Sequence, residues 1–243
     1  MGDSNGERRI AIIGHRGAMG LEPENSFSSF ERAISLGCNM IEMDARCTLD
    51  GKIVIMHDET VERTSDGKGT VSRMPLAELK NIRLSNGEEI PTLDEILERF
   101  GDRCILNIDL KDENSVLSSC AAVHRMKLLD SVIFSSFHSP WLVKAKLKYP
   151  HARTAFISDD RSLDLVRIAV ATEAEGINTS ARITNRKLIE KAHESGLKIN
   201  VWTVNRPWQM RKFMRLGADG IITDRPDILA NQQEKMAARE MKT

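Results

Sequence analysis

The feature that most constrains this chain is a regular alternation between short runs rich in β-branched residues and longer stretches with the period of an α-helix. This alternation is typical of β-α units built around a parallel sheet. Eight runs qualify as strands: Ile10–Gly14, Asn39–Asp44, Ile105–Lys111, Val132–Phe137, Thr154–Ser158, Gly176–Thr179, Ile199–Val204 and Gly220–Asp224. Because eight such units close a (β/α)8 barrel, the sequence predicts this α/β fold, the TIM barrel.

The distance in sequence between successive predicted strands fits one β-α unit everywhere except at one place. Successive strands begin 21 to 29 residues apart, except that the second begins at residue 39 and the third at residue 105. We therefore expect a small insertion after the second barrel strand. The 243 residues suffice for one such barrel. The predicted organisation is an N-terminal tail over 1–8, a barrel over 9–226 with a hairpin and insertion over 45–101, and a polar C-terminal helix over 227–243.

The insertion begins with a hairpin signal. Asp50-Gly51 is a dipeptide that favours a two-residue type I′ turn. In that register the numbers of paired residues sum to 101, so Asp44 opposes His57. The turn therefore predicts His57 beside the end of the second barrel strand, and a bulge would shift the pairing by one residue.

Two helix starts carry capping signals. Asn25 or Ser26 precedes an amphipathic stretch, and we interpret Asn25 as a cap rather than as a substrate contact. Thr92 and Glu95 have the spacing of a capping box.

The composition excludes several classes of partner. Lys and Arg number 35 and Asp and Glu number 35, so no net charge attracts nucleic acid or an anionic membrane. Charges interrupt every apolar stretch well short of the ~20 residues of a membrane-spanning helix, so we expect no membrane span. We also expect no secretory signal, and, because the four cysteines form no C-x-x-C pair, neither a zinc site nor a disulfide framework. These expectations favour a reducing cytoplasm.

Acidic residues alternate with apolar ones on two predicted strands. Glu42 and Asp44 are two residues apart, so a strand places both side chains on one face, which the apolar neighbours assign to the barrel interior. Buried like charges are costly unless a cation or a proton compensates, so a divalent metal is expected; a solvated strand edge is the alternative. Asp109 and Lys111 repeat the pattern on the next barrel strand. Asp109 could supply a third carboxylate and Lys111 could bind an anion, the alternative being a surface ion pair.

The first strand ends in His15-Arg16-Gly17. An imidazole is a candidate acid or base near neutral pH, and an arginine fork matches a phosphate. A structural histidine at a strand end is the alternative. His57 would add a second imidazole, so that an acid and a base could stand on opposite sides of one reacting centre.

In order and combination, these motifs resemble those of the glycerophosphodiester phosphodiesterases. The resemblance covers residues 15–69, which begin HRGAMGLEPENS and end HDETVERTSDGKG, and continues through PTLDEIL, NIDLK, SSF, VWTVN and GADGIITDRP. It implies a TIM barrel with a divalent-metal site that hydrolyses glycerophosphodiesters to glycerol 3-phosphate and an alcohol.

The resemblance also implies a role for each matching residue. These are the catalytic His15 and His57, the phosphate-binding Arg16, the metal-binding Glu42 and Asp44, and Lys111, which matches the lysine of the family's E-x-K. The family usually has Glu where this chain has Asp109, and the shorter side chain could bind the metal through water or change the preferred metal. Phe137 and Trp202 lie in matching segments where aromatic residues could form an apolar wall around glycerol, with ordinary packing as the alternative.

We therefore expect a small-molecule glycerophosphodiester substrate and one divalent cation, Mg²⁺ or Ca²⁺ with Mn²⁺ also accommodated, beside Glu42, Asp44 and Asp109. One histidine takes a proton from the attacking oxygen, of water or of the neighbouring glycerol hydroxyl, and the other protonates the leaving alcohol. The alternatives are a lysophospholipase D-type phosphodiesterase and a catalytically silent barrel that binds phosphodiesters. The residues leave open the released alcohol, the physiological metal, which histidine is the acid, and the oligomeric state.

Overall fold

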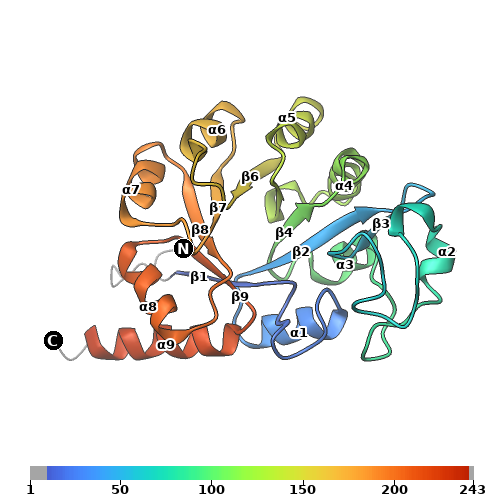
Figure 1. Ribbon diagram of the computed structural model, residues 1–243, viewed down its shortest axis with the longest axis horizontal. Helices are drawn as coiled ribbons and strands as arrows, with labels where there is room; N and C mark the ends of the chain where they lie inside the picture. Colours follow the sequence, from blue (N-terminus) through green and yellow to red (C-terminus); the bar gives the residue numbers. More distant parts are fainter. Residues whose placement is uncertain (1–9, 241–243) are drawn as a thin grey trace.

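The computed structural model describes residues 10–240, which form a closed barrel of eight parallel strands (Figure 1). Its strands are β1 (Ala11–Gly14), β2 (Met40–Cys47), β4 (Ile105–Leu110), β5 (Val132–Ser136), β6 (Arg153–Ser158), β7 (Gly176–Ser180), β8 (Lys198–Trp202) and β9 (Gly220–Thr223). The barrel closes because β1 pairs with both β2 and β9. The predicted (β/α)8 fold is confirmed.

Helices between the strands cover the outside of the barrel (Figure 1). They are α1 (Phe27–Ser35), α3 (Leu93–Phe100), α4 (Glu113–Arg125), α5 (Ser139–Lys148), α6 (Leu165–Ala171), α7 (Arg186–Glu194), α8 (Pro207–Leu216) and α9 (Pro226–Glu240), with a one-turn α2 (Leu76–Leu79) and 3₁₀ turns at Val71–Arg73 and Leu129–Ser131. Within residues 10–240, no helix has the length and apolarity needed to cross a bilayer.

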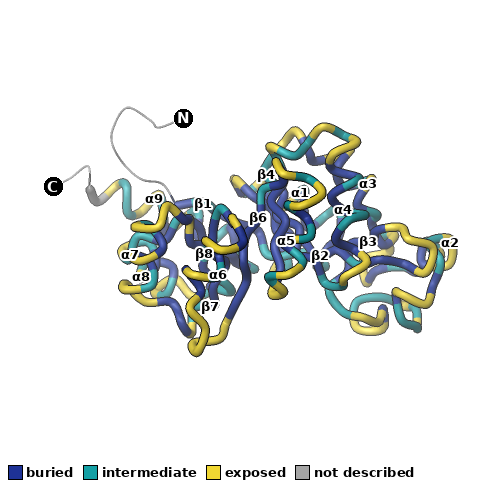
Figure 2. The backbone as a smooth tube through the Cα atoms, turned by 90° about the horizontal axis from the view of Figure 1, so that it is seen from above, coloured by how far each residue is buried: buried dark blue, intermediate teal, exposed yellow. Residues whose placement is uncertain are grey.

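Two layers of apolar side chains hold the barrel together. Outward-facing strand residues such as Ile41 and Phe134 are fully buried against the helices. A smaller cluster that includes Ile13, Ile133 and Ile222 packs apart from them, on the strand faces that alternate with the first set. In Figure 2 the buried residues concentrate in the strands, and many exposed residues lie in the outer loops. Burial of each such side chain contributes ~1.5–3 kcal/mol, so the barrel is a rigid support for its loops.

The helix caps agree with the sequence signals except at Asn25. Ser26 is the cap of α1 and accepts a hydrogen bond from the Ser29 amide at 3.1 Å. Thr92 and Glu95 form the predicted capping box of α3. Our interpretation of Asn25 as a cap is wrong, because its backbone is left-handed, with a φ of 56°, and its side chain contacts a barrel residue instead.

The hairpin between β2 and β3 (Ile53–Ile55) has a register one residue away from the predicted one. Ala45 pairs with Ile55 and Cys47 with Ile53, so the paired numbers sum to 100 rather than 101. A type I′ turn needs a positive φ at both central residues, whereas of Asp50 and Gly51 only Gly51 has one, at 77°. The loop therefore has three residues, and the predicted pairing of Asp44 with His57 is wrong.

The insertion between β2 and α3 projects from one side of the barrel, at the right of Figure 1. It has a small apolar core of its own, which includes Val54, Val61 and Leu79. Its Glu88 carboxylate accepts hydrogen bonds from the first amides of α1, at 2.8 Å from Phe27 N. The insertion is therefore fixed to the start of α1.

Candidate active site

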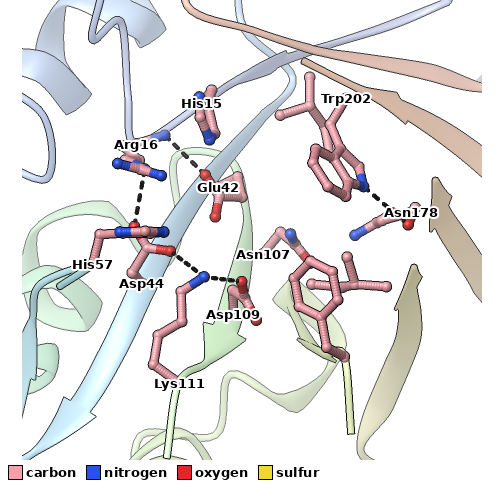
Figure 3. Close-up of a pocket in the computed structure, with 13 residues that line it drawn as sticks. His15, Arg16, Glu42, Asp44, His57, Asn107, Asp109, Lys111, Asn178 and Trp202 are labelled. Atoms are coloured by element: carbon pink, nitrogen blue, oxygen red, sulfur yellow. Dashed lines mark hydrogen bonds and ion pairs between the residues drawn. The ribbon is translucent and has the colours of Figure 1, made fainter. Parts of the chain in front are cut away.

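A cavity opens at the carboxyl ends of the barrel strands, the end at which the active sites of this fold lie (Figure 3). All nine residues that the sequence singled out line it: His15, Arg16, Glu42, Asp44, His57, Asp109, Lys111, Phe137 and Trp202. Asn107 and Asn178 also line it, and sequence reasoning missed both. The first of them continues the alternation that ends in Asp109 and Lys111, which is the signal that could have found it.

Three carboxylates come together on neighbouring strands. Glu42 and Asp44 lie on β2 and Asp109 on β4, where Asp109 is the cross-strand partner of Asp44. All three are buried, and one oxygen of each lies within 4.8 Å of the others. Burial and the neighbouring carboxylates raise the pKa of Glu42 and of Asp109. The Asp109 Oδ1 atom has no hydrogen-bond partner among residues 10–240.

Two cationic side chains face these carboxylates. The Lys111 Nζ atom lies 2.5 Å from Asp109 Oδ2 and 3.0 Å from Asp44 Oδ1. The Arg16 Nε atom lies 3.2 Å from Asp44 Oδ2. Burial would raise the pKa of Asp44, but Lys111 and Arg16 outweigh it and hold that pKa below its usual range. Burial would likewise lower the pKa of Lys111, yet the facing carboxylates raise it, so Lys111 stays charged.

The loop after β1 presents Arg16 in an unusual backbone conformation. Arg16 has a φ of 49°, and its amide donates to Glu42 Oε2 at 2.9 Å. Gly17 follows with a φ of 84°, and a Cβ atom there would lie 2.7 Å from the Ser29 carbonyl carbon. This turn needs a glycine because helix α1 passes directly against it.

His15 is held by a carboxylate from the last strand-helix loop. Its Nδ1 atom lies 2.6 Å from Asp224 Oδ1, and Asn205 donates to the other oxygen of Asp224 at 2.6 Å. Burial would lower the pKa of His15, but Asp224 and the nearby Glu42 outweigh burial and raise it. Sequence analysis placed Asp224 only at the end of the last predicted strand; its contact with His15 arises because β1 pairs with β9.

His57 reaches the same cavity from the hairpin despite the shifted register. Its Nδ1 atom lies 2.6 Å from Asp58 Oδ1. Burial lowers the pKa of His57 and outweighs the opposing effects of Asp44 and Asp58. In both histidines, a carboxylate at Nδ1 orients the ring and leaves Nε2 as the nitrogen available for proton transfer.

Three asparagines lie in or beside the cavity. Asn25 donates to Asp44 Oδ2 at 2.8 Å, so it holds a carboxylate instead of capping a helix. The Asn107 side-chain oxygen is buried and has no partner in the described part of the chain. Asn178 accepts from Trp202 Nε1 through its backbone oxygen at 3.1 Å.

Phe137 and Trp202 both line the cavity, and Figure 3 shows Trp202 across from the carboxylates. Their rings meet edge to face with centroids 5.8 Å apart, and Phe137 is 44% exposed. An aromatic side chain exposed at the mouth of a cavity can contact the apolar edge of a ligand.

Comparisons with known proteins point to one family. The sequence profile of the glycerophosphoryl diester phosphodiesterase family matches residues 15–228. A glycerophosphodiester phosphodiesterase of Caldanaerobacter subterraneus is 33% identical, over 93% of this chain and 99% of its own length. One from Bacillus altitudinis is 30% identical, over 93% and 98% of the two lengths.

Solved structures show the same similarity. An Oleispira antarctica phosphodiesterase in complex with the product sn-glycerol-3-phosphate is 27% identical, with a TM-score of 0.86 over 92% of this chain and 96% of that one. The glycerophosphodiester phosphodiesterase of Thermotoga maritima is also 27% identical, with a TM-score of 0.81 over 93% and 99%.

Proposed function

Because this chain belongs to the glycerophosphoryl diester phosphodiesterase family, we propose that it hydrolyses glycerophosphodiesters to glycerol 3-phosphate and an alcohol. The observation that carries the proposal is the meeting of two histidines, two cations and three carboxylates in one cavity at the barrel mouth. The product complex of the Oleispira antarctica phosphodiesterase supports the substrate class.

The three buried carboxylates fit a divalent cation. Glu42, Asp44 and Asp109 offer hard oxygen ligands, and the unpartnered Asp109 Oδ1 is available to one. When bound, Mg²⁺ or Ca²⁺, with Mn²⁺ as a further candidate, would polarise the phosphoryl oxygens and neutralise developing charge. Asp109 is one methylene shorter than the family's usual Glu, so it would bind the metal through water or change the preferred metal.

Arg16 and Lys111 bind the substrate phosphate in this proposal. Arg16 lies on the left-handed turn after β1, and Lys111 directly follows β4. Both are largely buried, so an anionic phosphate would meet cations that little water screens. Phe137 and Trp202 would line the apolar side of the glycerol.

His15 and His57 transfer the protons. One removes a proton from the attacking oxygen, of water or of the neighbouring glycerol hydroxyl, while the other donates to the leaving alcohol. Each presents Nε2 to the cavity because a carboxylate occupies its Nδ1.

A turnover assay tests the activity. We expect hydrolysis of glycerophosphocholine or glycerophosphoethanolamine that depends on added Mg²⁺, Ca²⁺ or Mn²⁺ and stops when the metal is chelated. If the protein bound sn-glycerol 3-phosphate yet turned over neither diester with any of these metals, a silent phosphodiester-binding barrel would be the better account. Turnover of a lysophospholipid in place of both would favour the lysophospholipase D-type alternative.

Single replacements test the two histidines. His15→Ala or His57→Ala should lower kcat by about 10²–10⁴-fold, the usual contribution of a positioned acid or base. A diester with p-nitrophenolate as its leaving group needs no proton on that group. On this substrate the variant that lacks the acid should recover its turnover rate, whereas the variant that lacks the base should not. Near-normal rates of both variants on glycerophosphocholine would show that these histidines are structural.

A further inference from the structure

Arg63 lies in the insertion and connects two carboxylates that flank the active site. Its Nη1 and Nη2 atoms each donate to Glu24 at 2.7 Å. Its Nε atom donates to Asp58 Oδ2 at 2.5 Å, and Nη2 to Asp58 Oδ1 at 3.1 Å. One guanidinium therefore bonds to both oxygens of two separate carboxylates.

Each of these carboxylates contacts a residue of the cavity. Glu24 Oε1 accepts from Arg16 Nη1 at 2.7 Å, and Asp58 Oδ1 lies 2.6 Å from His57 Nδ1. The contacts run without a break from Arg16 through Glu24, Arg63 and Asp58 to His57. Arg63, Glu24 and Asp58 are not among the residues that line the cavity.

We propose that Arg63 is a positioning residue that sets the phosphate-binding Arg16 and the proton-transferring His57 relative to each other by bridging Glu24 and Asp58. The roles of Arg16 and His57 rest on the proposed function, whereas the bridge itself rests only on these contacts. The two site residues come from different segments, the loop after β1 and the hairpin after β2, and Arg63 is the link between their carboxylate partners.

The chemistry of the bridge requires an arginine. A guanidinium presents five donors in a planar fork and can meet two carboxylates at once, whereas an ammonium is a point donor on a flexible stem. Without the cation, Glu24 and Asp58 would be neighbouring like charges. Glu24 could still pair with Arg16, and Asp58 with His57, but nothing would hold the two pairs in one arrangement.

The insertion holds the backbone near Arg63 in place. Val61, two residues earlier, is fully buried in the insertion's own core, and its carbonyl accepts from Ser65 Oγ at 2.7 Å. Glu88 attaches the insertion to the start of α1. Of the residues that the structure describes, His57 is the one in the insertion that lines the cavity. Through Arg63, the insertion also contributes to the active site from outside the cavity.

Arg63 contributes more to geometry than to folding. Its side chain is 49% exposed, and exposed ion pairs typically stabilise a fold by less than ~1 kcal/mol. An Arg63→Ala protein is therefore expected to fold, so that its activity reports on the site.

The test compares Arg63→Ala and Arg63→Lys with a control, Arg83→Ala. Arg83 is another arginine of the insertion, but it donates to backbone oxygens of Lys80 and Ile82, away from the cavity. Three quantities are measured for each protein: kcat and KM on glycerophosphocholine, the Kd of sn-glycerol 3-phosphate by calorimetry, and the ¹⁵N NMR signature of the His57 tautomer.

We expect Arg63→Ala to lower kcat by about 10–100-fold, the scale on which misplacement by about 1 Å reduces a rate. It should also weaken sn-glycerol 3-phosphate binding. Because Asp58 would no longer be held beside Nδ1, the Nδ1–H tautomer of His57 that this contact favours should give way to a mixture. Arg63→Lys, which keeps the charge but not the fork, should recover only part of each loss. Arg83→Ala should match the wild type in all three.

A folded Arg63→Ala protein with wild-type kcat, product affinity and His57 signature would overturn the proposal. If Arg63→Ala failed to fold, an Arg63→Lys protein with wild-type kcat, product affinity and His57 signature would overturn the proposal, because a positive charge alone would then suffice. The tautomer measurement needs no turnover, so failure of the proposed activity would remain distinguishable from failure of the bridge.

Discussion

Both histidines of the cavity depend on carboxylates that follow barrel strands or their hairpin. Asp224 holds His15 and Asp58 holds His57, each through Nδ1 at 2.6 Å. An ionised carboxylate at this nitrogen fixes the tautomer and stabilises the imidazolium that forms during proton transfer. The orientation of each ring is thus set by a neighbour that does not line the cavity.

The substitution Asp224→Asn should therefore impair turnover while the fold survives. The side-chain amide that it introduces could donate to Nδ1 and favour the wrong tautomer of His15. We expect a kcat reduction of up to about 10⁴-fold, the loss found when the carboxylate of a Ser-His-Asp triad is replaced by its amide. Steady-state kinetics on glycerophosphocholine measures it.

Asp219→Asn provides a matched control, because Asp219 pairs with His193 at 2.8 Å outside the cavity. Its kcat should stay near that of the wild type. Equal losses of kcat in the two variants would mean that Asp224→Asn disturbs the fold in general and does not act through His15.

Asp58 should make stability depend on pH. Hydrogen bonds from Arg63 and His57 lower the pKa of Asp58 in the folded protein. A carboxyl with a lowered folded-state pKa stabilises the fold above its unfolded value of ~3.9, and this stabilisation is lost as the pH falls toward the folded value. Asp58→Asn should thus be less stable than the wild type at pH 7, by about 1 kcal/mol or less for a partly exposed pair.

Urea unfolding at several pH values measures this difference. The two free energies of unfolding should converge as the pH falls below about 4, the ordinary pKa of an aspartate. A difference that stayed constant from pH 7 to pH 3 would show that the charge of Asp58 does not contribute.

The loop after β1 carries His15 and Arg16 of the cavity and packs closely against helix α1. Gly17 and Gly37 have nearly the same φ, 84° and 83°. A Cβ at Gly17 would lie 2.7 Å from the Ser29 backbone, whereas one at Gly37 would meet nothing within 4 Å. An alanine at Gly37 would therefore introduce only the backbone strain of a left-handed residue, whereas an alanine at Gly17 would add a steric clash.

We expect Gly37→Ala to destabilise the fold by about 1 kcal/mol, through backbone strain alone. Gly17→Ala should cost more and should also lower kcat, because the displaced turn carries Arg16. Denaturant unfolding and kinetics on both variants check this. Equal stability losses with unchanged kcat would show that the loop adapts without moving Arg16.

Barrel closure brings into one place groups that are far apart in the sequence. His15 and Asp224 are 209 residues apart and meet because β1 pairs with β9. The three carboxylates meet across β2 and β4, with the insertion between them in the sequence. Binding at this centre should consequently stabilise the whole molecule.

A divalent cation at the carboxylates should raise the thermal midpoint. Binding only to the folded state stabilises it by ~2.7 kcal/mol at a hundredfold excess over Kd, which for a chain of this size corresponds to roughly 5–10 °C. Thermal unfolding with Mg²⁺, Ca²⁺ or Mn²⁺, and after chelation, measures the shift. The Glu42→Ala, Asp44→Ala double variant should show none; an equal shift there would place the cation elsewhere.

The sequence by itself determined the architecture and predicted nine residues that line one cavity. Hydrophobic periodicity and the spacing of eight strands predicted the barrel. Alternation and strand ends singled out six residues, namely His15, Arg16, Glu42, Asp44, Asp109 and Lys111. The hairpin signal added His57, and the resemblance to the family implied Phe137 and Trp202. Such patterns are local, because alternation along one strand decides which side chains face inward.

Only the tertiary structure decided how those residues are held. The one-residue shift of the hairpin depends on the φ of Asp50 and Gly51. The contact of Asn25 with Asp44 and that of Asp224 with His15 depend on strand pairing, and the link through Arg63 depends on how the insertion lies against the barrel. The physical reason is that strand periodicity fixes which face a side chain takes, whereas its partner is fixed by the register and closure of segments distant in the sequence.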